Sequence, residues 1–361
     1  MYRVAITGRA NSFSNGYGQG IERYKYEITR RLISNYTDDI LVQKNELKPL
    51  PLNIQNRSAS ALLFLMGALF SRFQGYSIVH NLEQMPLISP LKGQNVKTIQ
   101  TLYDFQAVDN PASLETKKSF VAHSRMALFV QLARVQNFYK DKCDHFIAIS
   151  STTRDSAVKH GFDPRKITVI NLGIDERFSS HKNRFPNTKT VGYVGSFSIN
   201  KNLLFALKSF EKIKDENIEF KIWGKGQSFD IYKNLDPSLR FDSRIKFMGF
   251  APENKIVDIY DEFQVLVFPS LVEGFGIPVL EAQSRGIPVI ILKNSILPPE
   301  VRKYSIEVND YTEMSEAVTE IMNGSFSDTK RKEMINYSRS FTWDLVAKKT
   351  FDLYSKLLEL N

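Results

Sequence analysis

The sequence predicts an α/β protein made of two doubly wound, Rossmann-like domains. Short apolar runs, typical of parallel strands that are buried on both faces, alternate with helical segments along the chain. The alternation stops in a polar, irregular stretch near the middle and then restarts. With 361 residues, the chain is longer than one typical core and suits two domains.

We therefore expect an N-terminal domain over 1–175, a linker over 176–190 and a second domain over 191–340. The last segment, 341–361, is predicted to form a helix that packs back on the first domain. Two such domains would face each other across a cleft lined by strand ends.

In the first half, Tyr24, Ile28 and Leu32 have helical spacing and predict a helix over 21–32. Ser151 is suited to cap the last helix of this half. The other helices are expected over 58–73, 113–142 and 152–160, and the strands over 3–6, 39–43, 77–80, 96–102, 144–150 and 166–170.

The second half repeats this pattern from residue 191 onward. Pro278 suits the first position of a helix that follows a glycine-containing loop. The strands are expected over 191–194, 218–223, 245–248, 265–268 and 287–292, and the other helices over 203–213, 253–263, 311–322, 328–337 and 343–358.

The composition indicates a cytoplasmic protein. The single cysteine, Cys143, cannot form an internal disulfide, fits a reducing compartment and is expected to pack beside a strand start. Residues 2–6 run directly into a polar loop without the pattern of a signal peptide. The longest apolar run, 61–70, is shorter than the roughly 20 residues that span a bilayer.

The net charge of +9 favours an anionic partner, such as a nucleic acid, an acidic membrane surface or a phosphorylated substrate. Basic residues are spread through both halves, which argues against a dedicated nucleic-acid arm. The expected helix over 113–142 is basic and rich in interleaved aromatic residues, a pattern typical of helices on anionic membranes. A solvated helix with one face on the core is the alternative.

The main candidate site is the segment 269–281, PSLVEGFGIPVLE, between a buried strand and a helix. Gly274 and Gly276 lie between two carboxylates, Glu273 and Glu281. The unpaired first amides of a helix, together with its dipole, suit phosphate oxygens, and carboxylates suit hydroxyl donors. A ligand with both a phosphate and several hydroxyls would use both features. Taken alone, Glu281 could also be a first-turn carboxylate that favours the helix dipole.

Lys201 follows the first strand of the second domain and is expected to face the same crevice, where a lysine with helix-terminal amides suits a diphosphate. The chain has no Asp-x-Asp and no His/Cys cluster with metal-ligand spacing, so we expect neutralisation by the protein without an obligatory metal. It also lacks the GxxxxGK[ST] loop of NTPases and the GxSxG elbow.

The first half offers two weaker candidates. Gly16, Gly18 and Gly20 form a GxGxG loop between a strand and a helix, which is either a phosphate cradle or a flexible surface loop. Asp104 follows a strand at its carboxyl end, where ligands bind in open α/β sheets, although a lone Asp there is as often a turn former or cap.

Together these motifs resemble the retaining glycosyltransferases of family 4, which have the GT-B fold. The Glu-x7-Glu signature of that family corresponds to Glu273 and Glu281. The resemblance extends along nearly the whole chain, through YGQGIERY, TLYD, FIAISSTTR, VINLGID, VGYVGSFSINKNL, IWGKG, IKFMGF and SFTWDLVAKK.

The resemblance implies a nucleotide-diphosphate sugar as donor, with catalysis by Glu273, Lys201 and Asp104. Glu273 would hold hydroxyls of the donor sugar, Lys201 the diphosphate and Glu281 the ribose. Transfer would retain the anomeric configuration by front-face attack, without a protein nucleophile. The other implied donor-binding residues are Gly274, Phe275, Gly276, Ile277, Gly195, Ser196, Gly249, Phe250, Gly18, Gly20 and Tyr103.

The chain departs from the family pattern in two respects. Tyr103 stands where many members have a histidine that touches the donor sugar. Ser196 and Asn200 stand where many members have an arginine near the diphosphate, so binding of the diphosphate would depend more on Lys201.

The predicted function is transfer of a hexose or deoxyhexose, with mannose or rhamnose favoured, to a growing surface glycan such as O-antigen or capsule. The acceptor would be a glycan, or a glycan linked to polyprenyl diphosphate, and the enzyme would lie on the inner face of the cell membrane, with no cofactor and no nucleic-acid partner. The alternatives are a nucleotide-sugar epimerase or hydrolase on the same fold, and a non-catalytic protein that binds nucleotides or nucleic acid.

Overall fold

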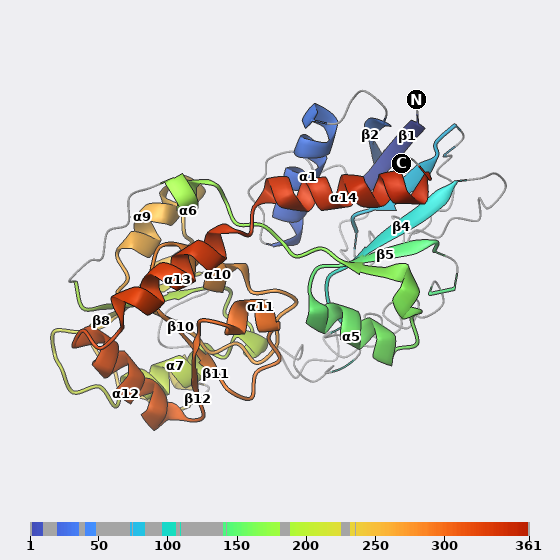
Figure 1. Cartoon of the computed structure of the whole chain (residues 1–361). Coiled ribbons are helices and arrows are strands. Elements are labelled where there is room, and N and C mark those ends of the chain that lie inside the picture. Colours follow the sequence, from blue (N-terminus) through green and yellow to red (C-terminus); the bar gives the residue numbers. More distant parts are fainter. Residues whose placement is uncertain are drawn as a thin grey trace, which may run out of the picture. The chain divides into compact units, whose positions relative to one another are not determined.

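The structure is a computed structural model in which the chain forms two compact units, residues 1–173 with 343–361 and residues 174–342 (Figure 1). The expected helices over 58–73 and 113–142 lie almost entirely outside the described residues, so the membrane-binding helix stays a prediction. The structure describes residues 2–9, 20–35, 40–47, 73, 75–83, 96–105, 109, 140–141, 143–180, 188–224, 232–234 and 236–359.

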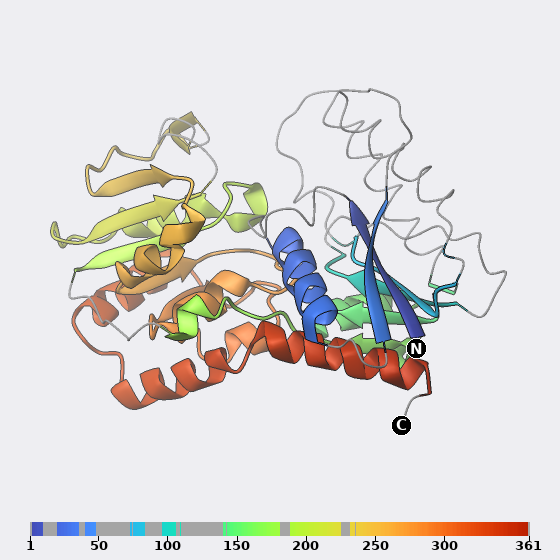
Figure 2. The same cartoon turned by 90° about the horizontal axis from the view of Figure 1, so that it is seen from above.

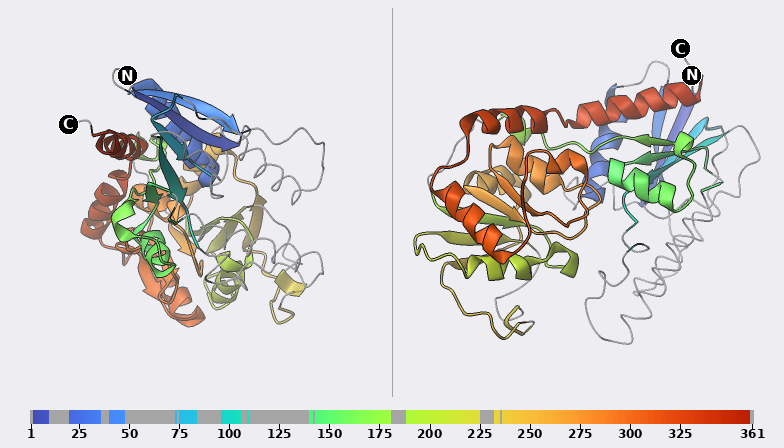
Figure 3. Two further views of the ribbon diagram at one scale, coloured as in Figure 1. Left: turned by 90° about the vertical axis from the view of Figure 1, so that its right-hand side faces the viewer. Right: turned by 60° about the horizontal axis from the view of Figure 1, so that its bottom comes forward.

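Unit 1 is built on a parallel sheet of six strands in the order β2-β1-β3-β4-β5-β6. Every residue of β3 and β5 is buried, as expected for apolar strands covered on both faces. The strands are twisted relative to their neighbours (Figure 3). The elements are β1 (Tyr2–Arg9), α1 (Ile21–Asn35), β2 (Ile40–Leu47), β3 (Ile78–Asn81), β4 (Lys97–Leu102), β5 (His145–Ala148), α5 (Ser151–Lys159), β6 (Ile167–Val169) and α14 (Trp343–Leu357).

The cap of α5 differs from the prediction. Ser150, and not Ser151, accepts the hydrogen bond from the Thr153 amide, at 3.0 Å. Ser150 has the extended backbone of a capping residue, whereas Ser151 is already helical. Cys143 is buried near the start of β5, as expected, in a cluster that includes Phe146.

The last helix, α14, belongs to unit 1 and runs beside α1 (Figure 2). Trp343 at its start is buried, with its ring 6.2 Å from that of Tyr24 on α1. Further along, the Tyr354 hydroxyl lies 2.6 Å from Nδ1 of His80 on β3. The C-terminal segment therefore supplies part of the unit 1 core.

His80 makes the stability of this core depend on pH. It is fully buried, with Nε2 2.9 Å from the Thr101 hydroxyl, and burial lowers its pKa to about 3. Below pH 6.5, the ordinary value for histidine, the unfolded chain takes up a proton that the folded chain refuses until about pH 3. Acid therefore favours unfolding through this residue, and above pH 6.5 His80 contributes no pH dependence.

We expect His80→Gln to flatten the fall of stability in acid by roughly 1.4 kcal/mol per pH unit, the contribution of one proton. Urea unfolding of the full chain and the variant, compared between pH 7 and roughly pH 4.5, measures this slope. The substitution also removes two hydrogen bonds, but that loss shifts stability at every pH alike. Equal slopes for the two proteins would show that His80 is not the group that responds.

Unit 2 is a second parallel sheet of six strands, in the order β12-β11-β10-β7-β8-β9. The chain builds β7, β8 and β9 outward to one side, then returns to build β10, β11 and β12 on the other. The reversal leaves a switch point between β7 and β10, which is where ligands bind in open α/β sheets. The elements are α6 (Arg177–Ser180), β7 (Thr190–Val194), α7 (Leu203–Phe210), β8 (Glu219–Trp223), β9 (Ile245–Gly249), α9 (Ile256–Asp261), β10 (Val265–Phe268), α10 (Ile277–Ser284), β11 (Val289–Leu292), α11 (Pro299–Arg302), β12 (Ile306–Val308), α12 (Tyr311–Met322) and α13 (Asp328–Arg339).

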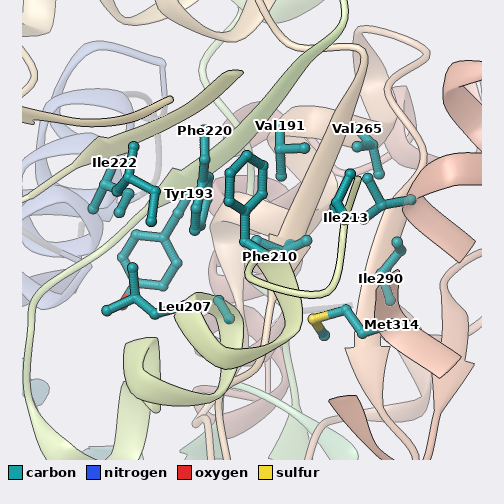
Figure 4. Packing of buried hydrophobic residues seen from close by; sticks show 14 of the residues in the cluster. Val191, Tyr193, Leu207, Phe210, Ile213, Phe220, Ile222, Val265, Ile290 and Met314 are labelled. Carbon is teal, nitrogen blue, oxygen red and sulfur yellow. The ribbon is translucent and has the colours of Figure 1, made fainter. Parts of the chain in front are cut away.

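The main core of unit 2 lies between the sheet and helices α7 and α12 (Figure 4). Phe210 on α7 packs on Phe220 of β8, with ring centroids 5.2 Å apart. Helices α10 and α13 contact each other elsewhere in the unit (Figure 1). Burial of aromatic and branched side chains is the main force that fixes these helices on the sheet.

The sequence did not predict three short elements of unit 2. The segment expected to be an irregular linker contains α6, and Phe178 on it is fully buried against the Tyr260 ring, 5.2 Å away. Helix α11 and strand β12 were missed as well. A single helical turn, or a three-residue strand with a charged centre such as β12, has neither a helical period nor the continuous apolar run that marks the other short strands.

Candidate active site

The candidate site of unit 2 is formed by the loops at the carboxyl ends of β7 and β10. The first loop contains a 3₁₀ turn, Ile199–Lys201, and the Asn200 carbonyl accepts a 2.8 Å hydrogen bond from the Leu271 amide of the second loop. The Lys201 ammonium donates directly to the Glu273 carboxylate. The two loops are therefore joined by the backbone and by an ion pair at the switch point of the sheet.

This ion pair is largely enclosed by the protein. The side chains of Lys201 and Glu273 are 22% and 10% exposed, and the Lys201 nitrogen also lies 5.8 Å from the centre of the Phe268 ring. The Glu273 amide donates to the Ile296 carbonyl at 3.0 Å, which fixes the loop on the segment after β11. The sequence predicted that Lys201 and the Glu273 loop share a crevice, but it gave no signal for the Phe268 contact.

Helix α10 starts immediately after the loop. Gly276 is its N-cap residue and has φ = +98°, a conformation that favours glycine. The cap has no side-chain hydrogen bond. Pro278 is the second helical residue, not the first as expected, and has no amide N–H. The Val279 amide donates to the Gly276 carbonyl at 3.0 Å, which leaves the Ile277 amide at this helix end. Phe275 is buried, with its ring 6.1 Å from Phe341. Phe275, Gly276 and Ile277 therefore form a fixed turn, and their expected backbone contacts with a donor stay a prediction.

Glu281 lies one turn further along α10 and is 5% exposed. One of its carboxylate oxygens, Oε2, accepts a 2.9 Å hydrogen bond from the hydroxyl of Tyr260 on α9. The sequence did not single out Tyr260, because a tyrosine on the apolar face of a helix has the pattern of an ordinary core residue.

Three glycines bring the ends of β7, β8 and β9 close together. The Gly195 amide donates to the Trp223 carbonyl at 3.0 Å, and the Gly224 amide donates to the Gly249 carbonyl at 2.8 Å. A Cβ atom on Gly224 would lie 1.8 Å from the Gly195 carbonyl oxygen, a distance that allows no side chain. Gly249 has φ = +78°, and Phe250 after it is 57% exposed.

Ser196 is one of the two residues that stand where the sequence resemblance led us to expect an arginine. Its carbonyl accepts a 2.8 Å hydrogen bond from Tyr193, and its hydroxyl lies 3.1 Å from that of Ser198. Ser198 in turn donates to the Asn200 side chain at 2.6 Å. These neutral groups order the loop before Lys201, but they supply no positive charge.

The predicted site residues of unit 1 differ from one another in how far they are buried. Tyr103 is 2% exposed and its hydroxyl donates to the Leu82 carbonyl at 2.7 Å; burial raises its pKa well above the usual value. Its contact with a donor sugar stays a prediction, and almost none of the Tyr103 surface is exposed to make such a contact. Asp104 is partly exposed after β4, Gly20 is exposed before α1, and Gly18 lies outside the described residues.

Among the residues that the structure describes, no three His, Cys, Asp or Glu side chains are grouped so that they could hold a metal ion. None of the described helices is long and apolar enough to cross a membrane. The expectations of a metal-independent reaction and of a peripheral membrane location stay predictions.

Two family models match successive parts of the chain. Residues 18–178 match the model described as Glycosyltransferase Family 4, and residues 175–341 match the model described as Glycosyl transferases group 1. The second match covers unit 2 almost entirely.

Curated relatives are distant. The chain is 24% identical over 306 residues to an uncharacterised glycosyltransferase of Methanocaldococcus jannaschii, covering 80% of this chain and 74% of the relative. It is 26% identical to the UDP-Gal:α-D-GlcNAc-diphosphoundecaprenol α-1,3-galactosyltransferase of Escherichia coli (63% and 64% covered). It is 24% identical to the O-antigen chain mannosyltransferase B of Escherichia coli (46% and 45% covered).

Solved structures establish the fold. Sucrose-phosphate synthase from Thermosynechococcus elongatus superposes with a TM-score of 0.74 at 16% identity, covering 100% of both chains. The two parallel-sheet units are thus the two Rossmann-like domains of the GT-B fold, as the sequence predicted.

Proposed function

We propose that this chain, which carries a glycosyltransferase family 4 domain followed by a group 1 domain, is a retaining glycosyltransferase that uses a nucleotide-diphosphate sugar. The donor would bind to unit 2, at the switch point between β7 and β10. One observation carries the proposal: Lys201 and Glu273, which lie far apart in the sequence, form an ion pair at this point.

Each charged group suits one part of such a donor. The Lys201 ammonium can neutralise a diphosphate oxygen, together with the Ile277 amide at the start of α10. The Glu273 carboxylate can accept hydrogen bonds from sugar hydroxyls beside that diphosphate. Glu281, further along α10, can accept from the ribose hydroxyls. The exposed Phe250 ring after β9 can contact the base.

The proposed reaction needs no protein nucleophile. The acceptor hydroxyl attacks the anomeric carbon on the face from which the diphosphate leaves, and a diphosphate oxygen takes the hydroxyl proton. The new glycosidic bond therefore keeps the donor configuration. Lys201 would stabilise the charge that develops on the leaving diphosphate, and this contribution would be greatest in the transition state.

The sugar and the acceptor are proposed from the relatives. One relative is named as a mannosyltransferase of O-antigen chains, and another as acting on a sugar linked to diphosphoundecaprenol. We favour mannose as the sugar or, on the sequence resemblance alone, rhamnose, and a growing surface glycan linked to polyprenyl diphosphate as the acceptor. The net charge of +9 is consistent with work at an anionic membrane surface.

Proton NMR of the reaction tests the proposal against its rival enzymes. With the matching donor and a glycan-lipid acceptor, the expected product is a glycoside with the anomeric configuration of the donor. An inverted product would refute retention. A nucleotide sugar with an altered sugar, or free sugar formed equally well when the acceptor is left out, would support an epimerase or a hydrolase instead.

A further inference from the structure

Tyr260 is a buried polar residue to which the proposed reaction assigns no role. It lies on α9, is fully buried, and its hydroxyl donates to Oε2 of Glu281 at 2.9 Å. Its ring is held edge-on by Phe178, 5.2 Å away, and lies 5.8 Å from the ring of Phe263. The hydroxyl is therefore fixed by the packing of the ring and cannot move away from the carboxylate without disturbing the core.

A second link joins the same two helices. Asp261, the next residue of α9, accepts two hydrogen bonds from the Arg285 guanidinium at the end of α10, at 2.7 and 2.9 Å. The Arg285 side chain is completely buried. This bidentate pair fixes α10 on α9 independently of Tyr260, so docking of the helix does not need the tyrosine hydroxyl.

We infer that Tyr260 is a positioning residue, which holds the Glu281 carboxylate in the orientation that accepts hydrogen bonds from the ribose hydroxyls of the donor. The inference rests on the proposed function. A carboxylate has about four acceptor positions on its two oxygens, so one bond from Tyr260 leaves capacity for a diol. Loss of the Tyr260 hydrogen bond removes one restraint on the Glu281 carboxylate, and ordering that carboxylate would then cost part of the binding free energy.

Removal of the Tyr260 hydroxyl should lower the affinity for a nucleotide only when the ribose of that nucleotide has its hydroxyls. Tyr260→Phe keeps the packed ring and removes only the hydroxyl. We expect it to weaken binding of a ribonucleoside diphosphate about tenfold, in the range of one hydrogen bond to a charged group. Binding of the 2′,3′-dideoxy form, which lacks the diol, should change less than about twofold. The wild-type protein should prefer the ribose form.

Isothermal titration calorimetry of the full chain with UDP and GDP, each beside its 2′,3′-dideoxy counterpart, measures these affinities. Tyr337→Phe is the matched control, because that hydroxyl donates to the Glu300 carbonyl in the same unit, at 3.0 Å. The control should bind all ligands as the wild type does. Glu281→Gln combined with Tyr260→Phe should be little weaker than Glu281→Gln alone, since both act through one contact.

The possible outcomes separate the inference from the function on which it rests. Equal weakening of the ribose and dideoxy forms by Tyr260→Phe would show a purely structural role and overturn the inference. Unchanged binding in the variant would overturn it too, while a preference of the wild type for the ribose form would leave the proposed function in place. A wild-type protein that binds neither nucleotide would refute both.

Discussion

Glu273→Gln is expected to lower the rate of sugar transfer by about a hundred- to thousandfold, the loss typical of one group that stabilises a transition state. Glutamine keeps the size of the side chain but removes the negative charge that contacts Lys201 and would accept hydrogen bonds from the donor sugar. Nucleoside diphosphate binding should change much less, because that contact belongs to Lys201. Initial rates at saturating donor and calorimetry with the nucleoside diphosphate measure the two effects separately.

Lys201→Met should also lower the rate of transfer and, unlike Glu273→Gln, should weaken binding of the nucleoside diphosphate about ten- to hundredfold. Removing one partner of a mostly enclosed pair also destabilises the fold, so the double variant Lys201→Met/Glu273→Gln is the stability control. Lys221 and Glu262 form a matched pair in the same unit, at 2.7 Å. Lys221→Met and Glu262→Gln should leave transfer unchanged, and loss of activity in these controls would contradict a specific role for the first pair.

Gly224→Ala is expected to have the second largest effect and to reduce both stability and donor binding. The added Cβ would lie 1.8 Å from the Gly195 carbonyl oxygen and 2.8 Å from the Phe197 ring. Because the nearer atom belongs to the backbone, the ends of β7 and β8 must separate, which costs about 1–3 kcal/mol or more. The same shift moves the loop that leads to Lys201.

Thermal unfolding with and without donor measures this prediction. Gly324→Ala is the control for a loss of stability without a clash: Gly324 has a positive φ, +87°, which strains an alanine, but a Cβ there would meet nothing within 4 Å. The control should lower the melting temperature and still respond to donor. A Gly224→Ala protein as stable as the wild type, with the same donor response, would contradict the close approach of the two strand ends.

The sequence predicted the parallel sheets well because their strands are short apolar runs with polar ends. It also placed α12 from Tyr311 to Met322, as observed, where Asp310 caps the helix by accepting from the amides of Thr312 and Glu313. It missed α6, where one buried aromatic, Phe178, fixes a polar segment. Local pattern cannot show which distant side chain will cover such a residue.

The same limit applies to the site. The proximity of Lys201 and Glu273 could be predicted because each residue follows a strand of one parallel sheet, and parallel strands end at the same edge. The partner of Glu281 could not be foreseen, because nothing in the sequence around Tyr260 distinguishes its hydroxyl from that of any core tyrosine. Nor could the sequence show that the Tyr103 hydroxyl is used by the Leu82 carbonyl.

The most direct test of a nucleotide-sugar site in unit 2 is a thermal-shift panel of GDP-, UDP-, dTDP- and ADP-sugars on the wild type and on Lys201→Met. A bound donor stabilises the folded chain by an amount that grows with its concentration over its dissociation constant. We predict that one nucleotide class raises the melting temperature of the wild type in a dose-dependent way and fails to do so in the variant. A wild type that responds to none of the four, or a variant that responds as the wild type does, would contradict a donor site built on Lys201.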